Sequence, residues 1–378
     1  MKEYLDFNAT TPVSKETADL MHKYLVNDFG NAGSRTHETG SNAKKAVINA
    51  REEISNIFDA DFSELIFTSG ATESNNIAIL GLREHARKIG KNHIISSEIE
   101  HKAILDPLKV MESNGFKVTY IKPNKSGIIE EEKVIEQINE DTFLISIMHA
   151  NNETGAINPI NEIFSKAKSI DPDIFCHSDA SQTFAKTNLD FTNKDIDMFS
   201  VSAHKFYGPK GIGALLTRRR DGLSLPLKPL MFGGGQEKGL RPGTLPVHLI
   251  AGMGHACSSS NKLSHQWHEE CSNIKALALE AFSNIEHKIY GDEISSLPNT
   301  LSISFADIHA EALIICLKDI AEIATGSACT SASYTPSHVL TSMGLNEKEA
   351  TQVVRFSWGP QTSNSIWVDI ANKIETLI

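Results

Sequence analysis

The apolar run Phe143-Leu144-Ile145-Ser146-Ile147-Met148 is followed closely by the polar segment Asn151-Asn152-Glu153-Thr154-Gly155. A short apolar run bounded by polar and glycine residues is typical of a strand buried on both faces. Six similar runs, spaced by stretches with helical patterning, lie at 66–68, 93–96, 118–121, 174–177, 198–201 and 214–216. Strands that alternate with helices predict right-handed βαβ crossovers and an α/β fold with a mostly parallel seven-stranded sheet.

The pattern changes after about residue 250. A helical stretch at roughly 250–285 precedes a strand at 299–305 and a helix at 309–318. A segment rich in Ser, Ala and Thr occupies 325–335, and a strand at 353–357 precedes a final helix. This order predicts a second, smaller α+β domain.

Composition limits the classes of function. The 378 residues carry 47 acidic and 36 basic side chains, a net charge of −11 that disfavours a broad nucleic-acid-binding face. The basic triplet at 218–220 is interpreted as a solvated turn. No run approaches the roughly 18 apolar residues of a membrane helix, and residues 1–6 lack the apolar core of a secretory signal.

The five cysteines are odd in number and contain no Cys-x-x-Cys pair. This usage disfavours a disulfide framework or a zinc site, and it fits a reducing cytoplasm. His265 and His268 have a spacing that can bind metal, but no further ligand lies nearby in the sequence. A solvated helix face is the preferred interpretation, so no metal site is expected.

A lysine follows the strand at 198–201, in the segment Ser202-Ala203-His204-Lys205-Phe206. In an open parallel sheet, ligands bind beyond the carboxyl ends of the strands. Burial and the neighbouring His204 would favour a neutral amine, which is the form that condenses with a carbonyl group. The segment therefore indicates a Schiff-base lysine. The glycines of 208–213 have neither P-loop nor dinucleotide-binding spacing.

Two other strand ends carry polar groups suited to a phosphorylated ring. Asp179 follows the strand at 174–177 and could pair with a pyridine nitrogen, although an isolated Asp there is more often a helix N-cap. The segment Ser69-Gly70-Ala71-Thr72 joins a strand to a helix start, where N–H groups and hydroxyls suit a phosphate. The alternative is a capping box with Thr72 or Ser69 as the cap, and both interpretations can hold together.

Three further positions are candidates for substrate chemistry. His101, beyond the strand at 93–96, could stack on a flat ring and move protons near neutral pH. Asn152, beyond the strand at 143–148, supplies an amide. Arg355, in an apolar strand, requires a carboxylate partner, which is either structural or the substrate's own.

Cys329 lies in the segment Thr325-Gly326-Ser327-Ala328-Cys329-Thr330-Ser331, which has no apolar pattern. This setting predicts a loop that exposes the thiol, and exposed thiols are usually avoided unless they are used. The other four cysteines have apolar or helical surroundings and are expected to be packing residues.

These segments together resemble the NifS/IscS-type cysteine desulfurases of the class-V aminotransferase family. The resemblance starts at residues 4–12, includes 30–37, 233–237 and 241–244, and ends at 355–357, so it covers nearly the whole chain. It implies a pyridoxal 5'-phosphate (PLP)-dependent transferase of fold type I. The large PLP-binding domain would span 14–254, and the small domain would span 1–13 and 255–378, with the cysteine loop at about 325–335.

The resemblance also implies roles for individual residues. Lys205 would bind PLP covalently, and Cys329 would receive the sulfur of L-cysteine as a persulfide while L-alanine is released. Asp179 would bond the pyridine nitrogen, and His101 would stack on the ring and move protons. The remaining contacts would be Ala71, Thr72, Ser202 and His204 at the phosphate, Asn152 and Gln182 at the phenolic oxygen and substrate region, and Asn31 and Arg355 in the substrate pocket.

Thr244 would reach the phosphate of the partner subunit, which implies a homodimer. Pro242, where the family has a small residue, would stiffen this loop because proline fixes φ and lacks an N–H. The chain ends at Ile378, without the tail that helps IscS-type members to dock an iron–sulfur scaffold. We therefore expect a sulfur donor to a protein acceptor in a specialised pathway, such as DNA phosphorothioation or tRNA thiolation.

Several alternatives compete with this interpretation. Iron–sulfur cluster assembly and selenocysteine lyase activity use the same residues. An aminotransferase has no use for the thiol of Cys329. A non-catalytic subunit is disfavoured because Lys205, Asp179 and Cys329 are all present.

Overall fold

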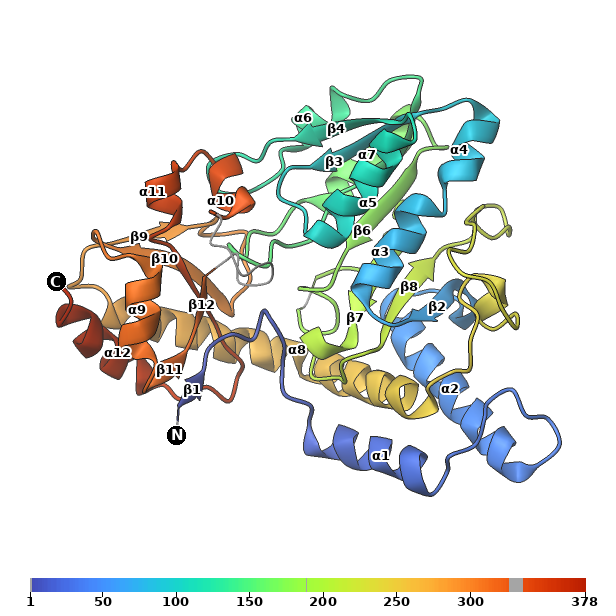
Figure 1. The fold of residues 1–378 in the computed structure, drawn as a ribbon, viewed down its shortest axis with the longest axis horizontal. Coiled ribbons are helices and arrows are strands. Elements are labelled where there is room, and N and C mark those ends of the chain that lie inside the picture. Colours follow the sequence, from blue (N-terminus) through green and yellow to red (C-terminus); the bar gives the residue numbers. More distant parts are fainter. Residues whose placement is uncertain (1, 188, 326–335) are drawn as a thin grey trace.

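The computed structural model describes residues 2–187, 189–325 and 336–378. Cys329 lies outside these described residues. Two main sheets lie at opposite ends of the molecule, and the long helix α8 runs between them (Figure 1). The N-terminus lies beside the smaller sheet.

The larger sheet has seven strands in the order β2-β8-β7-β6-β5-β3-β4. Its strands are β2 (Leu65–Thr68), β3 (His93–Ser97), β4 (Lys117–Ile121), β5 (Thr142–Ser146), β6 (Phe175–Asp179), β7 (Met198–Ser202) and β8 (Gly213–Thr217). β8 is antiparallel to both of its neighbours, and the other pairs are parallel. The predicted seven-stranded, mostly parallel sheet is therefore confirmed.

Helices separate most strands of the large sheet, as expected, and the helices placed at about 250–285, at 309–318 and at the C-terminus are α8, α9 and α12. In the first half they are α1 (Lys15–Val26), α2 (Glu38–Ile57), α3 (Ala71–Leu80), α4 (Arg83–Ile89), α5 (Lys102–Ser113), α6 (Glu131–Ile135) and α7 (Ile160–Ile170). After α8 (Val247–Ala281) come α9 (Ala310–Leu317), α10 (His338–Ser342), α11 (Glu347–Ala350) and α12 (Ile366–Glu375). Short 3-10 turns are η1 (Phe62–Glu64), η2 (Ala203–Lys205) and η3 (Glu237–Gly239).

Successive residues of the large-sheet strands point to opposite faces, and both faces are apolar. Phe67 and Phe199 belong to one buried cluster, to which α2, α7 and α8 contribute. Their chain neighbours Ile66 and Met198 belong to the other, to which α3, α4 and α5 contribute. Helices on both faces leave the carboxyl ends of the strands as the open edge.

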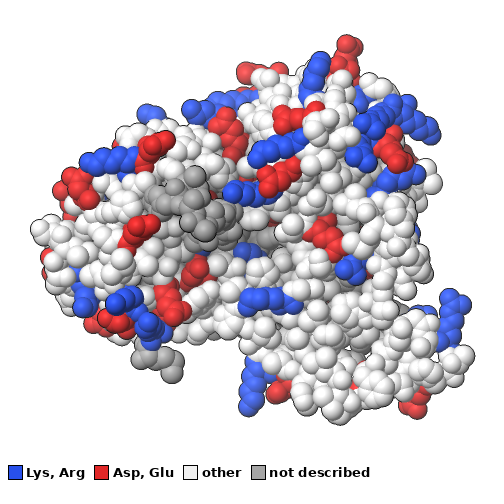
Figure 2. Space-filling view, in the orientation of Figure 1, with Lys and Arg blue, Asp and Glu red and all other residues white. Residues whose placement is uncertain are grey.

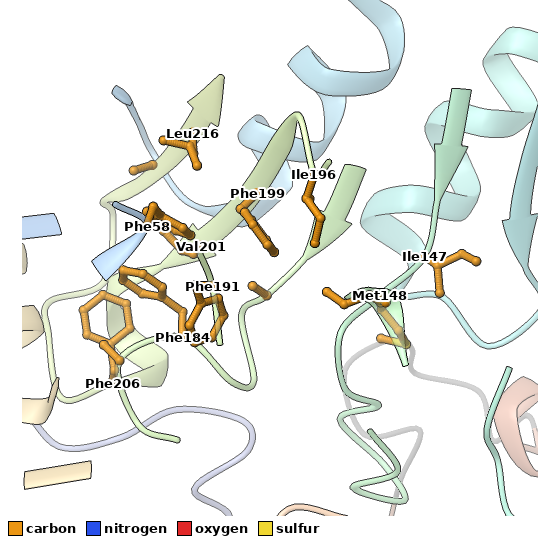
Figure 3. Packing of buried hydrophobic residues seen from close by; sticks show 14 of the residues in the cluster. Phe58, Ile147, Met148, Phe184, Phe191, Ile196, Phe199, Val201, Phe206 and Leu216 are labelled. Carbon is orange, nitrogen blue, oxygen red and sulfur yellow. The ribbon is translucent and has the colours of Figure 1, made fainter. Parts of the chain in front are cut away.

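Aromatic rings anchor the segment that carries the candidate lysine. Phe206, directly after Lys205, is fully buried, and its ring centroid lies 5.5 Å from that of Phe184. Phe184 in turn stacks on Phe58 at 4.7 Å (Figure 3). Burial of a Phe side chain contributes about 1.5–3 kcal/mol to folding stability, so the packing of Phe206 fixes the backbone that carries Lys205.

The smaller sheet has the order β12-β13-β10-β9, beside a two-stranded sheet of β1 and β11. These strands are β1 (Glu3–Tyr4), β9 (His287–Tyr290), β10 (Thr300–Phe305), β11 (Ala321–Glu322), β12 (Ala324–Thr325) and β13 (Val354–Ser357). The strands expected at 299–305 and 353–357 are β10 and β13. The boundaries proposed at residues 14 and 254 stay a prediction, although β1 pairs with β11 as a small domain with 1–13 requires.

Three expectations need correction. Arg218 is buried, not part of a solvated turn, because its guanidinium donates to the carbonyls of Phe58, Phe191 and Ile196. Cys316 is only half-buried on α9, whereas the other described cysteines are buried and free. β5 ends at Ser146 rather than at 148.

The surface charge, the helices and the clusters of potential metal ligands bear on what the protein can bind. Figure 2 shows side chains of both signs scattered over one face of the molecule, which has a hollow near its centre. None of the helices in the described ranges is long and apolar enough to cross a membrane. Within the same ranges, no group of three or more His, Cys, Asp and Glu side chains could hold a metal ion.

Candidate active site

A cavity of about 530 Å³ opens at the carboxyl ends of the central strands. It gathers most of the residues singled out in the sequence, which are Ala71, Thr72, His101, Asn152, Asp179, Gln182, Ser202, His204, Lys205 and Arg355. Asn31 and Thr244 are exposed and do not line this cavity. Cys329 lies outside the described residues.

Lys205 ends the turn η2, directly after β7. Its amine donates to the carbonyl of Asn8 at 2.6 Å and to that of Ala9 at 3.0 Å. The N-terminal segment therefore holds the lysine at the cavity. Backbone carbonyl acceptors carry no signal in the residue type, which is why sequence reasoning did not assign Asn8 to the site.

Asp179 is the last residue of β6 and is 8 % exposed. One carboxylate oxygen accepts from Asn75 Nδ2 at 2.7 Å, and the other accepts from the N–H of Ser181 at 2.9 Å. The N-cap alternative is wrong, because residues 181–186 form turns and no helix begins there; the bond from Ser181 N closes a turn instead. The two donors fix the carboxylate at the cavity, where its oxygens can accept a further hydrogen bond from a ligand.

Asn75 was quoted in the sequence but given no role. It lies one turn into α3, is fully buried, and points its amide at Asp179. The signal available in the sequence was a polar residue four positions after Ala71, because that spacing places both residues on one face of the helix.

The N-terminus of α3 is open to the cavity. Its N-cap is Gly70, which makes no side-chain capping bond, so the predicted cap by Thr72 or Ser69 is wrong. The first helical bond runs from Ser74 N to Gly70 O, which leaves the N–H groups of Ala71 and Thr72 ahead of it. Unpaired N–H groups at a helix N-terminus attract an anion.

Gly70 keeps this anion cradle clear. Its φ of +154° is one that L residues rarely adopt, and a Cβ here would lie 3.5 Å from Ser202 Oγ. Ser202 lines the same cavity from the end of β7. A side chain at position 70 would therefore strain the turn and fill the space between the two hydroxyl-bearing segments.

His101 caps α5, with its Nδ1 accepting from the N–H of Ala103 at 3.1 Å. Burial lowers the pKa of His101, although Asp179 acts in the opposite direction. The ring is therefore neutral near pH 7, and the cap bond assigns its proton to Nε2. His101 thus offers a flat neutral ring and one N–H donor.

His204 is also neutral. Burial, followed by the charges of Lys205 and Lys210, lowers its pKa to about 4. Its Nδ1 lies 3.2 Å from Thr10 Oγ1. Any effect of His204 on the amine of Lys205 therefore does not come from an imidazolium charge, because none is present near pH 7.

Arg355 lies on β13 and is 1 % exposed. Its guanidinium pairs with the carboxylate of Asp6 and donates to the carbonyl of Asn152 at 2.9 Å. Its Nε has no hydrogen-bond partner among the described residues. The carboxylate that the sequence required is thus Asp6, and the cation at the cavity remains able to attract a second anion.

Glu100 is a fully buried acid that sequence reasoning did not single out. Its Oε1 accepts from Ser97 Oγ at 2.7 Å and from Met148 N at 2.8 Å. Burial raises its pKa to about 8, so it is mostly protonated near pH 7. Its carbonyl accepts from His338 Nε2 at 2.9 Å, which ties α10 to the turn that carries His101.

Comparison with known proteins agrees with this geometry. The profile of the aminotransferase class-V family matches residues 3–365. Cysteine desulfurase IscS of Vibrio cholerae serotype O1 (strain M66-2) is 43 % identical over 365 residues, which are 96 % of this chain and 89 % of that protein. The chain belongs to the class-V aminotransferase family.

Solved structures place it among the NifS/IscS-type members. A NifS-like protein matches with a TM-score of 0.91 and 34 % identity, covering 100 % of this chain and 99 % of that one. DndA from Streptomyces lividans matches with a TM-score of 0.83 and 44 % identity, covering 93 % and 98 % respectively. Fold type I and dependence on PLP follow from this membership.

The residues at the cavity fit PLP. Asp179 is a fixed acceptor for a ring N–H, the open turn at Gly70 suits a phosphate, and Lys205 supplies the amine. Ser181 Oγ lines the cavity and is buried without a described partner, which leaves a donor for a ligand. The volume lies within the roughly 300–1,000 Å³ of small-molecule sites.

Proposed function

We propose that the protein converts L-cysteine to L-alanine and transfers the sulfur to Cys329 as a persulfide. The observation that carries the proposal is the meeting of Lys205, Asp179 and the uncapped α3 N-terminus at one cavity. The 43 % identity to a cysteine desulfurase supports the choice of substrate.

Bound PLP would supply an electron sink for negative charge at the substrate Cα. Asp179 would accept a hydrogen bond from the protonated ring nitrogen, because Asn75 and Ser181 fix its carboxylate at the cavity. Lys205 would attach the cofactor in the resting enzyme, and its free amine would accept the proton from the substrate Cα. The carbonyls of Asn8 and Ala9 orient that amine.

Arg355 would hold the substrate carboxylate, because it is the buried cation at the cavity. His101 would take the substrate thiol proton at Nε2. This role requires the tautomer with the proton on Nδ1, and forming it breaks the bond from Ala103 N.

The described residues on either side of 326–335 are held by residues that line the cavity or lie next to it. Ala324 of β12 pairs with Arg355, and His338 bonds to the carbonyl of Glu100. Cys329 is four residues beyond Thr325, a stretch that spans at most about 13–14 Å. Chain connectivity therefore allows the thiol to reach the substrate.

The sulfur transfer balances without an external oxidant. The Cys329 thiolate forms an S–S bond to the substrate sulfur as the Cβ–S bond breaks. The electron pair of the broken bond stays with the carbon product, which takes up protons and leaves as L-alanine. A thiol reductant then releases the sulfur from the persulfide as sulfide.

The test measures alanine and sulfide released from L-cysteine by the PLP-loaded protein, with and without a thiol reductant. We expect alanine to form and sulfide release to depend on the reductant, and the Cys329→Ala variant to lose both. Cys316→Ala is the matched control, since Cys316 is half-buried on α9 and does not line the cavity. Wild-type protein that binds PLP but releases no alanine would overturn the proposal.

The acceptor is proposed to be a protein of a specialised pathway in the reducing cytoplasm, either DNA phosphorothioation or tRNA thiolation. The 44 % identity to DndA supports DNA phosphorothioation, whereas the 43 % identity to IscS favours the alternative of iron–sulfur cluster assembly. Transfer of radioactive sulfur from loaded Cys329 to purified acceptors of each pathway separates them. Selenide release from L-selenocysteine, measured in parallel, tests the lyase alternative.

We also propose that the enzyme is a homodimer. Leu230, Met231 and Phe232 are exposed apolar residues in the segment that leads to Thr244, and Phe232 is 88 % exposed. Arg241 in the same segment bonds to Glu73 at 3.0 Å, so the segment is fixed against α3. A partner subunit would cover these side chains and receive Thr244 at its phosphate site.

A further inference from the structure

Behind the cavity, Lys186 donates from Nζ to Gln182 Oε1 at 3.1 Å. Gln182 Nε2 donates to the carbonyl of Asn8 at 3.0 Å, and the same carbonyl accepts from Lys205 at 2.6 Å. A continuous chain of hydrogen bonds therefore runs from Lys186 to the lysine that would attach PLP. Lys186 itself does not line the cavity.

This chain fixes the orientation of the Gln182 amide. The carbonyl of Asn8 can only accept, so the group that faces it must be the NH₂ of Gln182. The amide oxygen of Gln182 therefore faces Lys186, whose amine donates to it. The second hydrogen on Nε2 is then left for an acceptor in the cavity, which Gln182 lines.

The location of Lys186 is costly for an amine, which argues that it has a use. It forms no salt bridge within the described part of the chain, and its neighbours include the like charges of Lys205 and Arg355. Burial, then the charge of Lys205, lowers the pKa of Lys186 to about 7. Cys271, Tyr207 and Trp267 line the small space beside it.

The backbone supports the same placement. Ala185, directly before Lys186, has φ of +58°, a left-handed conformation that is unusual for a residue with a Cβ. Phe184, on its other side, is fully buried against Phe58 and Phe206 (Figure 3). The turn between an anchored ring and the lysine directs Lys186 back toward Gln182.

We propose that Lys186 is a positioning residue that fixes Gln182 as an N–H donor to the phenolic oxygen of PLP and, through the carbonyl of Asn8, steadies Lys205. The inference rests on the proposed function, because it presumes PLP in this cavity. A donor on the amide oxygen also polarises the amide, which strengthens the N–H at its other end.

The test compares Lys186→Met with Lys275→Met. Lys275 is a matched control, since it is also half-buried and donates to one side-chain oxygen, Ser296 Oγ at 3.0 Å, away from the cavity. Two quantities are measured: the PLP dissociation constant, and the pH midpoint of the absorbance change of bound PLP. We expect Lys186→Met to weaken PLP binding about three- to tenfold and to shift the midpoint, and Lys275→Met to change neither.

A double variant with Gln182→Ala tests whether Lys186 acts through Gln182. We expect Lys186→Met to have no further effect in that background. Full additivity of the two changes, or wild-type binding by Lys186→Met, would overturn the proposal. Lys186→Gln restores an uncharged donor and should recover most of the binding, and failure to recover it counts against the hydrogen bond.

The melting temperature of the apoprotein shows whether each variant folds. Lys186→Ala, which leaves room for water, gives the same comparison if the methionine does not pack. Failure of the proposed function has a different outcome, in which the wild-type protein itself binds no PLP. If the wild type binds PLP and both Lys186 variants bind it equally well, this inference is refuted and the proposed function is not.

Discussion

At the residue scale, the site depends on buried groups that do not touch the ligand. Asn75 holds Asp179. Glu100 joins Ser97 of β3 to Met148 beyond the end of β5, and its carbonyl accepts from His338. A polar group that is deeply buried costs free energy unless it is bonded, so these residues fix the geometry of the side chains around them.

Glu100 should make stability depend on pH. Its folded pKa of about 8 lies above its ordinary value of 4.5, because burial disfavours the charged form. Its contribution to the free energy of unfolding is full below about pH 4.5 and is lost as the pH rises to 8, at up to about 1.4 kcal/mol per unit. Glu100→Gln should abolish this slope and be more stable than the wild type at pH 9.

Denaturant unfolding of the apoprotein at pH 5, 7 and 9 measures this effect. Glu98→Gln, a half-buried acid two residues earlier, is the control and should keep the wild-type slope. Parallel stability curves for the wild type and Glu100→Gln would contradict a protonated Glu100.

Asn75→Ala should weaken PLP binding and lower turnover by about 10- to 100-fold. It removes the 2.7 Å bond to Asp179, and hydrogen bonds to charged groups contribute about 1.5–3 kcal/mol. Fluorescence titration with PLP and the rate of alanine release measure the two effects. Asn76→Ala, at the next position, removes a bond to Thr72 O and should bind PLP as the wild type does.

At the element scale, the cavity is built where strands and helices meet. The β2–α3 turn leaves a helix N-terminus open. The segment after β6 carries Gln182 and Lys186, which are joined by a hydrogen bond. The first turn contains Gly70, with a backbone conformation that suits glycine, and the second contains Ala185, with one that alanine disfavours. The structure around each turn stabilises these conformations.

Gly70→Ala should reduce stability by about 1–3 kcal/mol and weaken PLP binding at least tenfold, because φ of +154° is unsuited to alanine. Gly90→Ala is the control: its φ of +74° also disfavours alanine, but a Cβ there meets nothing within 4 Å. It should cost about 1 kcal/mol without changing PLP binding. Equal PLP binding by both variants would contradict a phosphate site at the N-terminus of α3.

Ala185→Gly should leave PLP binding unchanged. It should raise the free energy of unfolding by at most about 1 kcal/mol. Glycine relieves the strain of φ +58°, while the greater freedom of its unfolded chain offsets part of the gain. Thermal unfolding of the apoprotein measures the net effect. A large loss of stability would show that the methyl group is needed for packing, since Ala185 is fully buried.

At the scale of the whole molecule, the site lies between the two sheets. Asn8 joins them, since its side chain donates to Asn152 O and to Thr300 Oγ1, and its carbonyl receives Lys205. The exposed apolar residues of 230–232 lie outside this core, which is the basis for proposing a homodimer.

Phe232→Asp should convert the dimer to monomers and weaken PLP binding, because a buried aromatic anchor contributes about 2 kcal/mol or more to an interface. Light scattering after size exclusion gives the mass, and PLP titration gives the affinity. Ile294→Asp is the control, since Ile294 is 94 % exposed and lies in the other half of the chain. A wild-type protein that is monomeric would contradict the homodimer.

The sequence by itself determined the sheet, the order of its strands along the chain and the residues most directly tied to chemistry. Apolar runs and polar strand ends are local signals, and Lys205, Asp179 and Ala71 lie where parallel strands must end. Tertiary structure alone decided what surrounds them. Asn8, Glu100 and Lys186 act through carbonyls, burial and neighbours distant in the chain, and those interactions have no local pattern because they form only when the chain folds.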